Sequence, residues 1–341
     1  MIKSLLKNPL FMPGFLFIVL LLAASFVHAI FFDSVIPNMK LLYKHGELVA
    51  NTPFTPSQYP PFGSNNSGDN LFFIILMGAK YTIGVAIVVA ALRLVVSIVL
   101  GVLYGNYFMK VNRYVSKVVD AFHYLPIALL AYFILKTALM SNGMTQAFAY
   151  SYTARIIFEL VILTLVALPT TTLLIGNETS LILEKEYIVG AKIMGGSRLH
   201  IIRKHVIPHL IPKLWIQFTQ QIIQVLILLI HLGVLHLLFG GTLVKMGPGG
   251  TNYISLNGEW SGLIGKSIEH LSLYPWIPLV PLVAFACTML AFNLVLEGLK
   301  TVVEERDLPK RKKKRKRRTA TRPATVQPSF EFVQRDRQMN G

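Results

Sequence analysis

The side chains in this sequence that are best suited to binding a ligand or an ion lie inside long apolar stretches. One of them is Arg93, near the middle of the run 83–104, where a central charge costs about 2.5–3.5 kcal/mol. Such a guanidinium is expected to face a cavity or a partner rather than lipid. Two interpretations stay open: a structural ion pair, with Asp120 or Glu159 as the carboxylate, or a place on the path of a solute.

A stripe of amide and imidazole side chains occupies another apolar run, 214–238. Its members share one face of a helix, and they are Gln217, Gln220, Gln221, Gln224 and His231. The amides of a peptide need hydrogen-bond partners away from water, and these side chains can supply them along a translocation path. The alternative is hydrogen bonding between helices, at about 0.6 kcal/mol per contact.

The composition restricts the class of protein that carries these residues. Of 341 residues 53% are apolar and only 14% charged, and the mean hydropathy is +0.56. A soluble domain carries about 25% charged residues, so a water-soluble enzyme is disfavoured, and a disordered chain would contain far fewer apolar residues. The single cysteine, Cys287, excludes a disulfide framework and a cysteine-based metal site within one chain.

Six apolar segments approach the roughly 20 residues that cross about 30 Å of hydrocarbon. They are residues 10–32, 83–104, 118–139, 156–174, 214–238 and 276–296. We therefore expect an all-α integral membrane protein with six transmembrane helices. The first run is longer than a signal-peptide core, which favours a retained anchor. Gly101 and Gly105 have the spacing of close helix packing.

The distribution of Lys and Arg predicts the orientation. Most of them fall on one side if the N-terminus is cytosolic, and cytosolic loops are the basic ones, so both termini are expected to be cytosolic. The expected parts are an anchor helix at 1–32, an extracellular loop at 33–80, a transmembrane domain with spans two to six at 81–305, and a basic, disordered tail at 306–341. The loop 33–80 is rich in Pro, Asn and Ser, which indicates coil with turns.

The longest cytosolic loop, 177–213, differs from the other loops because it has helical periodicity. Apolar residues recur at helical spacing from 186 to 206, which predicts two short helices. Gly195-Gly196 would form the turn between them, and Pro208 and Pro212 would end the second. Gly190-Ala191 leaves a bare patch on the first helix, suited to docking another protein. An ordinary helix lying on the bilayer surface is the alternative.

The same loop carries a family resemblance. Val189-Gly190-Ala191, Gly195 and His205-Val206-Ile207-Pro208 resemble the Glu-Ala-Ala, Gly and aliphatic-Pro positions of the cytosolic signature in permease subunits of bacterial ABC importers. The closest resemblance is to the dipeptide/oligopeptide/nickel type. Further similar stretches cover about residues 60–305, and they are 61–63, 101–107, 120–126, 274–276, 290–293 and 297–299. The chain departs from the family at Val189, Gly190 and the Gly68-Asp69-Asn70 stretch.

The resemblance implies a function and a set of partners. The chain would be the permease subunit of an ATP-driven importer in the bacterial cytoplasmic membrane, conducting peptides or similar small solutes and coupling to ATPases through the loop 184–212. It implies a second, non-identical permease subunit, two cytosolic ATPases that hold ATP and Mg, and an extracellular solute-binding lipoprotein. This chain itself would hold no cofactor or metal and catalyse no reaction. The coupling contact would fall on Glu186, Val189, Gly190, Ala191, Gly195 and Pro208.

Two other functions stay open at the level of sequence. The altered positions Val189 and Gly190 are compatible with a non-transporting membrane scaffold or sensor that keeps the permease fold. An ion-driven carrier would require essential carboxylates within the membrane, for which Asp120 and Glu159 are the candidates. The cargo itself is not readable from the sequence.

A basic run follows the last span. Its residues are Lys310, Arg311, Lys312, Lys313, Lys314, Arg315, Lys316, Arg317 and Arg318. Basic residues close to an anionic membrane surface contribute about 1 kcal/mol each. The run starts soon after the last apolar segment, so we expect it to bind anionic lipid rather than nucleic acid.

Overall fold

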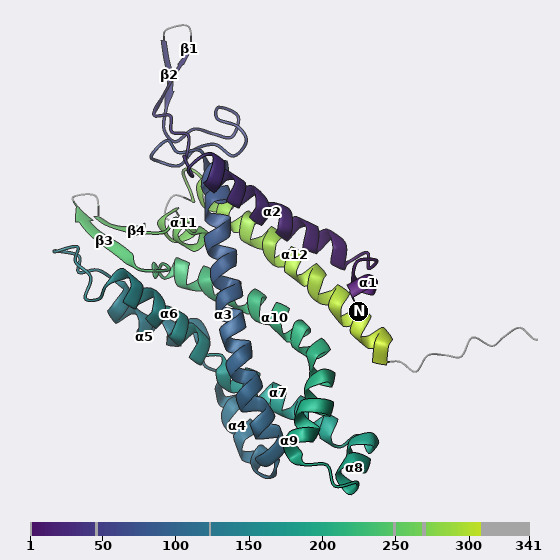
Figure 1. The fold of residues 1–341 in the computed structure, drawn as a ribbon. Coiled ribbons are helices and arrows are strands. Elements are labelled where there is room, and N and C mark those ends of the chain that lie inside the picture. The colour runs from purple at the N-terminus through teal and green to yellow at the C-terminus, as the bar shows by residue number, and fades with distance from the viewer. Residues whose placement is uncertain (1, 45–46, 123, 248–249, 268–270, 308–341) are drawn as a thin grey trace, which may run out of the picture. The chain divides into compact units, whose positions relative to one another are not determined.

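The computed structural model describes residues 2–44, 47–122, 124–247, 250–267 and 271–307. Residues 1–306 group into one compact unit. The described part of it is mainly helical, with two short β-hairpins (Figure 1). The basic run 310–318 lies outside the described residues, as does the rest of the expected tail from 308 on, whereas Arg306 and Asp307 belong to the last helix and not to a disordered segment.

Four unbroken helical segments are long and apolar enough to span a membrane. They are α2 (Phe11–Phe31), α3 (Leu71–Tyr107), the segment that ends in α10 (Ile207–Val234), and α12 (Trp276–Asp307). They contain most of the expected spans 10–32, 83–104, 214–238 and 276–296, which confirms these as apolar helices. Helix α3 begins earlier than expected because the Asn70 side chain accepts a hydrogen bond from the Phe72 N–H and caps it.

The other two expected spans are broken helices. The first consists of α4 (Asn112–Phe122), preceded by the short η1 (Met109–Val111), and α5 (Ile127–Leu139). The second consists of α6 (Tyr152–Leu165) and α7 (Leu168–Leu183), which meet at a bend of 46°. Pro169 in the first turn of α7 has no N–H to continue the ladder of α6. By length and composition the described helices therefore give four spans, or up to six if each broken pair is one span.

Small residues set the close packing of α3 on α7. A Cβ at Gly105 would lie 2.4 Å from the Gly176 carbonyl oxygen, and one at Gly101 would lie 2.8 Å from Ile175. Neither glycine can therefore carry a side chain without separating the helices. The expected close contact at Gly101 and Gly105 is confirmed.

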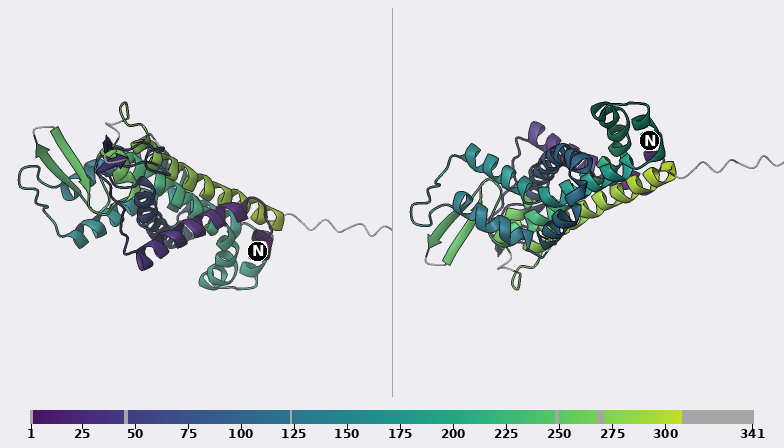
Figure 2. Two further views of the ribbon diagram at one scale, coloured as in Figure 1. Left: turned by 90° about the horizontal axis from the view of Figure 1, so that it is seen from above. Right: turned by 90° about the horizontal axis from the view of Figure 1, so that it is seen from below.

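Helix α2 packs along the second half of α12. A Cβ at Gly14 would lie 2.4 Å from the Ala291 carbonyl oxygen, and one at Gly298 would lie 2.6 Å from the Phe11 side chain. The left view of Figure 2 shows the start of α2 beside the last turns of α12. The N-terminal helix is thus joined to the last helix of the unit.

Two hairpins lie in the outer loops, and the first of them corrects the expectation of coil in 33–80. One pairs β1 (Leu41–Lys44) with β2 (Glu47–Asn51), and the other pairs β3 (Thr242–Gly247) with β4 (Gly250–Ser255). The second is anchored by a tertiary contact, because the Ser141 hydroxyl accepts a hydrogen bond from the Val244 N–H at 2.8 Å. The short helix α11 (Trp260–Ser267) follows it.

The loop 177–213 forms the two short helices that its periodicity predicted. They are α8 (Glu186–Ile193) and α9 (Arg198–Ile201), with Gly195 at φ +84° between them. The expected stop at Pro208 and Pro212 is wrong, since α9 continues through a π-helical turn, η2 (Ile202–Val206), into α10. Pro208 lies in the first turn of α10, where its missing N–H costs least, and the wider π turn before it accommodates the ring.

The loop helices and the hairpins lie at opposite ends of α3 (Figure 1). The start of α3 adjoins the first hairpin's segment, since Asn38 and Asp69 form a β-bridge. Its end adjoins the loop, since the Arg198 guanidinium lies 5.4 Å from the centre of the Tyr107 ring. Helix α3 is therefore the element that separates the two sets of loops.

Candidate functional site

Helix α8 is held to the rest of the chain by one buried side chain. Ile188 is fully buried and belongs to a small core with Ile182, Ile201 and Val206. Burying an isoleucine contributes about 1.5–3 kcal/mol. The helix is therefore anchored on one side, and its opposite side is left without a covering element in the described chain.

The uncovered side of the loop is apolar. Ile193 is 82% and Met194 84% exposed, and Val189 and Leu199 are exposed as well. We call Val189, Ile193, Met194 and Leu199 the α8 surface. An exposed apolar patch marks an interaction site, and the gathering of these four side chains within one short loop segment favours such a site here.

The backbone of α8 is also accessible. Apart from its own helix backbone and its two chain neighbours, no heavy atom of the described residues lies within 4 Å of the place where a Cβ on Gly190 would stand, and Glu186 is exposed in the first turn. Gly195 supplies the positive φ that ends the helix. The structure thus brings Glu186, Val189, Gly190, Ala191 and Gly195 together on one short helix and its turn, whereas Pro208 lies apart on α10.

Arg93 lies deep between helices, with a side chain only 2% exposed. Its Nε and Nη2 donate to the Leu163 carbonyl oxygen at 2.9 and 2.6 Å, and its Nη1 donates to Gln221 Oε1 at 3.2 Å. Among the described residues no carboxylate lies within salt-bridge distance of it. The expected ion pair with Asp120 or Glu159 is therefore not formed.

The break between α6 and α7 explains why a main-chain carbonyl takes that place. In a continuous helix the Leu163 oxygen would accept from the Ala167 N–H, but that N–H donates to the Thr164 oxygen instead. The carbonyl is left without a helical partner, and an unpaired buried carbonyl is costly. Arg93 satisfies it. The sequence held only an indirect signal for this contact, the proline at 169.

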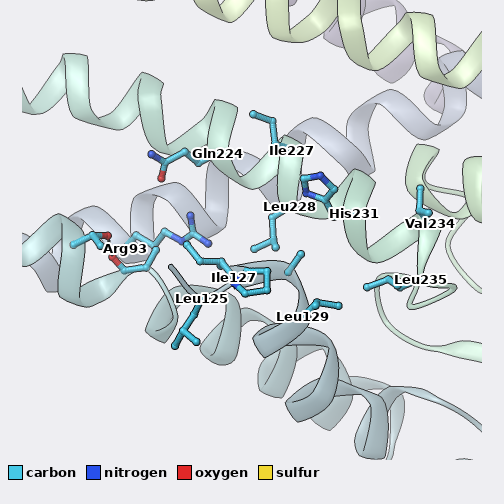
Figure 3. Close-up of a pocket in the computed structure, with 14 residues that line it drawn as sticks. Arg93, Leu125, Ile127, Leu129, Gln224, Ile227, Leu228, His231, Val234 and Leu235 are labelled. Atoms are coloured by element: carbon cyan, nitrogen blue, oxygen red, sulfur yellow. Dashed lines mark hydrogen bonds between the residues drawn. The ribbon is translucent and has the colours of Figure 1, made fainter. Parts of the chain in front are cut away.

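A cavity of about 680 Å³ adjoins Arg93. Figure 3 shows Arg93 towards one end of it and Val234 and Leu235 towards the other. Its other polar side chains are Thr170, Gln224 and His231, and the rest of the lining is apolar. The volume falls within the range of small-ligand sites, about 300–1,000 Å³.

The polar stripe on α10 divides between several roles. Gln224 and His231 line the cavity, while Gln221 is buried and orients Arg93. Gln217 donates from Nε2 to Gln220 Oε1 at 2.8 Å, within the same helix. All five side chains lie on α10, but of them only Gln224 and His231 line the cavity.

Two buried carboxylates, which the sequence did not mark as a unit, hold the segment after α10. Glu159 accepts from the Gly240 N–H at 2.9 Å, and Glu259 accepts from the Phe239 N–H at 3.2 Å. Glu259 also accepts from the Ser261 hydroxyl at 2.6 Å. Burial raises the pKa of the Glu259 carboxyl, although these hydrogen bonds oppose the shift. Their position in the fold assigns both groups to fixing the turn that leads into β3.

Residues 97–306 match a family model described as binding-protein-dependent transport system inner membrane component. The matched range includes α7 to α12, and therefore both the α8 surface and the stripe on α10. It begins within α3, shortly after Arg93.

The chain is similar to several permease proteins over most of its length. It is 23% identical to the dipeptide transport system permease protein DppC of Alkalihalophilus pseudofirmus over 302 residues, which cover 89% of this chain and 88% of the relative. It is 26% identical to the peptide transport system permease protein SapC of Haemophilus influenzae over 72% and 73%. It is 23% identical to the glutathione transport system permease protein GsiD of Pectobacterium atrosepticum over 73% of each chain.

Proposed function

Since this chain belongs to the family of binding-protein-dependent transport system inner membrane components, we propose that it conducts peptides, or small solutes like them, in an ATP-driven importer. It is a permease, a multi-pass membrane subunit of a transport complex. The relatives are named for the transport of a dipeptide, peptides and glutathione, and these names support a peptide-like cargo. The proposed site of action is the bacterial cytoplasmic membrane.

The proposed topology has six spans and two cytosolic termini. It counts α4–α5 and α6–α7 as one broken span each, which together with the four unbroken helices gives six spans. Broken helices are tolerated at membrane depth where protein or a cavity satisfies the freed backbone, and Arg93 does so for Leu163. The separation of the loop 177–213 from the hairpins along α3 (Figure 1) is compatible with loops on opposite membrane faces. The proposed parts remain an anchor at 1–32, an outer loop at 33–80 and a permease domain at 81–305.

The observation that carries the proposal is the α8 surface. An apolar, uncovered helix end next to a bare Gly190 suits insertion into a cleft of another protein. The partner proposed for it is a cytosolic ATPase, one of two, which would hold ATP and Mg and contact the loop 184–212. Val189, in place of an acidic residue, would then add apolar contact instead of an ion pair.

The other partners follow from the same proposal. A second, non-identical permease subunit would close the path beside α5 and α10, which line the cavity. An extracellular solute-binding lipoprotein would approach the hairpins in 33–80 and 240–274. The basic run 310–318 would rest on anionic lipid. When ATP draws the two ATPases together, the α8 helices would move with them and shift the permease pair between two states.

The test is co-purification of ATPases with a charged variant of the bare patch. Gly190→Arg places a long cation on the proposed contact at a position where the Cβ itself meets no neighbouring element of the described chain, so we expect loss of the ATPases and of ATP-driven uptake. Gly247→Arg is the matched control, since its Cβ position is equally open but lies on β3. Retention of the ATPases by Gly190→Arg would refute coupling through α8.

A further inference from the structure

The cavity beside Arg93 contains a positive charge that the described chain does not neutralise. The guanidinium is buried, and all three of its hydrogen bonds go to neutral oxygens, those of Leu163 and Gln221. No carboxylate of the described residues lines the cavity, whose other polar side chains are those of Thr170, Gln224 and His231. A charge in an apolar environment is strongly attracted to an anion that can reach it.

The guanidinium still has donors to offer. Arginine carries five N–H groups, and the three bonds leave one N–H on Nη1 and one on Nη2. These two terminal nitrogens can approach the two oxygens of a carboxylate side by side, which is the geometry that arginine favours. Because Leu163 and Gln221 already fix the side chain, Arg93 loses little conformational entropy when an anion binds.

The rest of the cavity specifies what the anion is attached to. Leu125, Ile127, Leu228 and Val234 offer apolar walls, which would accept aliphatic or aromatic side chains. Gln224 and His231 are spaced two helical turns apart along the same wall (Figure 3). They can bond to amide groups of an extended molecule.

We propose that this cavity binds the C-terminal carboxylate of the peptide cargo, with Arg93 as the specificity-determining residue. The inference rests on the proposed function and makes it sharper: the cargo is an unmodified peptide with a free acid end. The carboxylate lies against the free N–H groups of Arg93, and the residues before it lie along Gln224 and His231. The site holds its ligand in transit, so the expected affinity is modest.

The experiment measures equilibrium binding of tritiated trialanine to the purified transport complex without the solute-binding protein. The peptide is supplied as the free acid and as the C-terminal amide. We expect the wild-type complex to bind the acid about tenfold more tightly, the effect of one charge-assisted contact. A ratio near one would overturn the inference.

Two variants and a control locate the effect. Arg93→Gln is expected to bring the ratio to about one by weakening the acid alone, and Arg93→Lys to keep part of it, because lysine retains the charge without the fork. Lys136 is an exposed residue of α5 that does not line the cavity. Lys136→Gln should therefore keep the wild-type ratio of acid to amide affinity. Equal weakening of acid and amide by Arg93→Gln would show a structural role only and overturn the inference.

A competition experiment distinguishes a peptide ligand from a lipid, and an uptake experiment distinguishes failure of this inference from failure of the proposed function. Laurate presents a carboxylate from the bilayer, and we expect no displacement of trialanine by it; displacement that depends on Arg93 would reassign the site to fatty acid. Uptake of both peptide forms by the complete system together with a ratio of one would leave the transport function intact and sink only this inference. Absence of any ATP-dependent peptide uptake would instead contradict the proposed cargo.

Discussion

The α8 surface exposes apolar side chains, whereas the Arg93 site buries a charge. At the α8 surface, apolar side chains stand in the open, with Ile193 and Met194 more than four-fifths exposed. At the Arg93 site, a charge is enclosed among apolar side chains. Neither arrangement is favourable for this chain alone. The difference lies in what would complete each one, a protein for the apolar surface and an anionic ligand for the charge.

The two sites also differ in how far the chain itself has satisfied them. Arg93 already has Leu163 and Gln221 as partners, so its replacement by an apolar side chain, which cannot donate to them, should lower the stability of the fold. The α8 surface contributes nothing to the core, because Ile188 on the other side anchors the helix. Changes there should affect assembly and leave stability alone. The following variants break or sharpen this contrast.

The largest effect is expected from the pair Ile193→Asp and Met194→Asp. Two charges on the α8 surface should weaken ATPase binding by about 30-fold or more, since a buried interface anchor is worth about 2 kcal/mol or more. The measurement is ATPase affinity on an immobilised permease complex. The thermal midpoint of the permease should stay at the wild-type value, and a large fall in it would show that these side chains belong to the core.

Arg93→Met should instead lower stability. It leaves the Leu163 carbonyl and the Gln221 side chain without their donor, at about 1–3 kcal/mol for each unsatisfied group. Thermal unfolding in detergent measures the loss, and Lys136→Met is the control because that lysine is exposed. Equal losses of stability from the two substitutions would contradict the claim that the buried hydrogen bonds of Arg93 stabilise the fold.

The double substitution Gln221→Leu with Gln224→Leu tests the polar face of α10. We expect ATP-driven peptide uptake to fall about tenfold, the effect of lost hydrogen bonds to a desolvated ligand, while the complex still assembles. Normal uptake by this variant would refute a role for these amides on the path.

A smaller effect is expected at Glu259, a buried group whose partners all lie in this chain. Its pKa is raised by burial, so its stabilising contribution is complete below the ordinary pKa of glutamate and is lost as pH rises through the folded pKa. Glu259→Gln should remove that pH-dependent part of the thermal midpoint. Glu297→Gln is the control, since Glu297 forms only an exposed pair with Lys300. An unchanged pH profile in Glu259→Gln would contradict the assignment.

The sequence predicted what depends on local composition. Apolar runs identified α2, α3, α10 and α12 because hydropathy is a property of the segment itself, and the periodicity of 186–206 identified α8 and α9. The stop at Pro208 was wrong because a π turn absorbed the ring, a compensation that no propensity describes. The hairpin β3–β4 was missed because Ser141, about a hundred residues earlier, helps to fix it.

The site divides in the same way. The position of Arg93 within an apolar run was visible, but its partner was not, because the acceptor is a carbonyl freed by the break at Val166–Ala167. Sequence reasoning sought a carboxylate, the commonest partner of a buried arginine. The exposed Ile193 and Met194 were likewise unreadable, since which side of α8 is covered depends on where Ile188 is buried.

The contact between α8 and a motor subunit is tested most directly by cross-linking in the intact complex. In a Cys287→Ser background, which removes the exposed native thiol, Ile193→Cys would carry a short thiol-to-amine cross-linker, with the exposed Met246→Cys on β3 as the control. We expect Ile193→Cys to join the ATPase and Met246→Cys not to. A functional complex in which Ile193→Cys never reaches the ATPase would contradict the account.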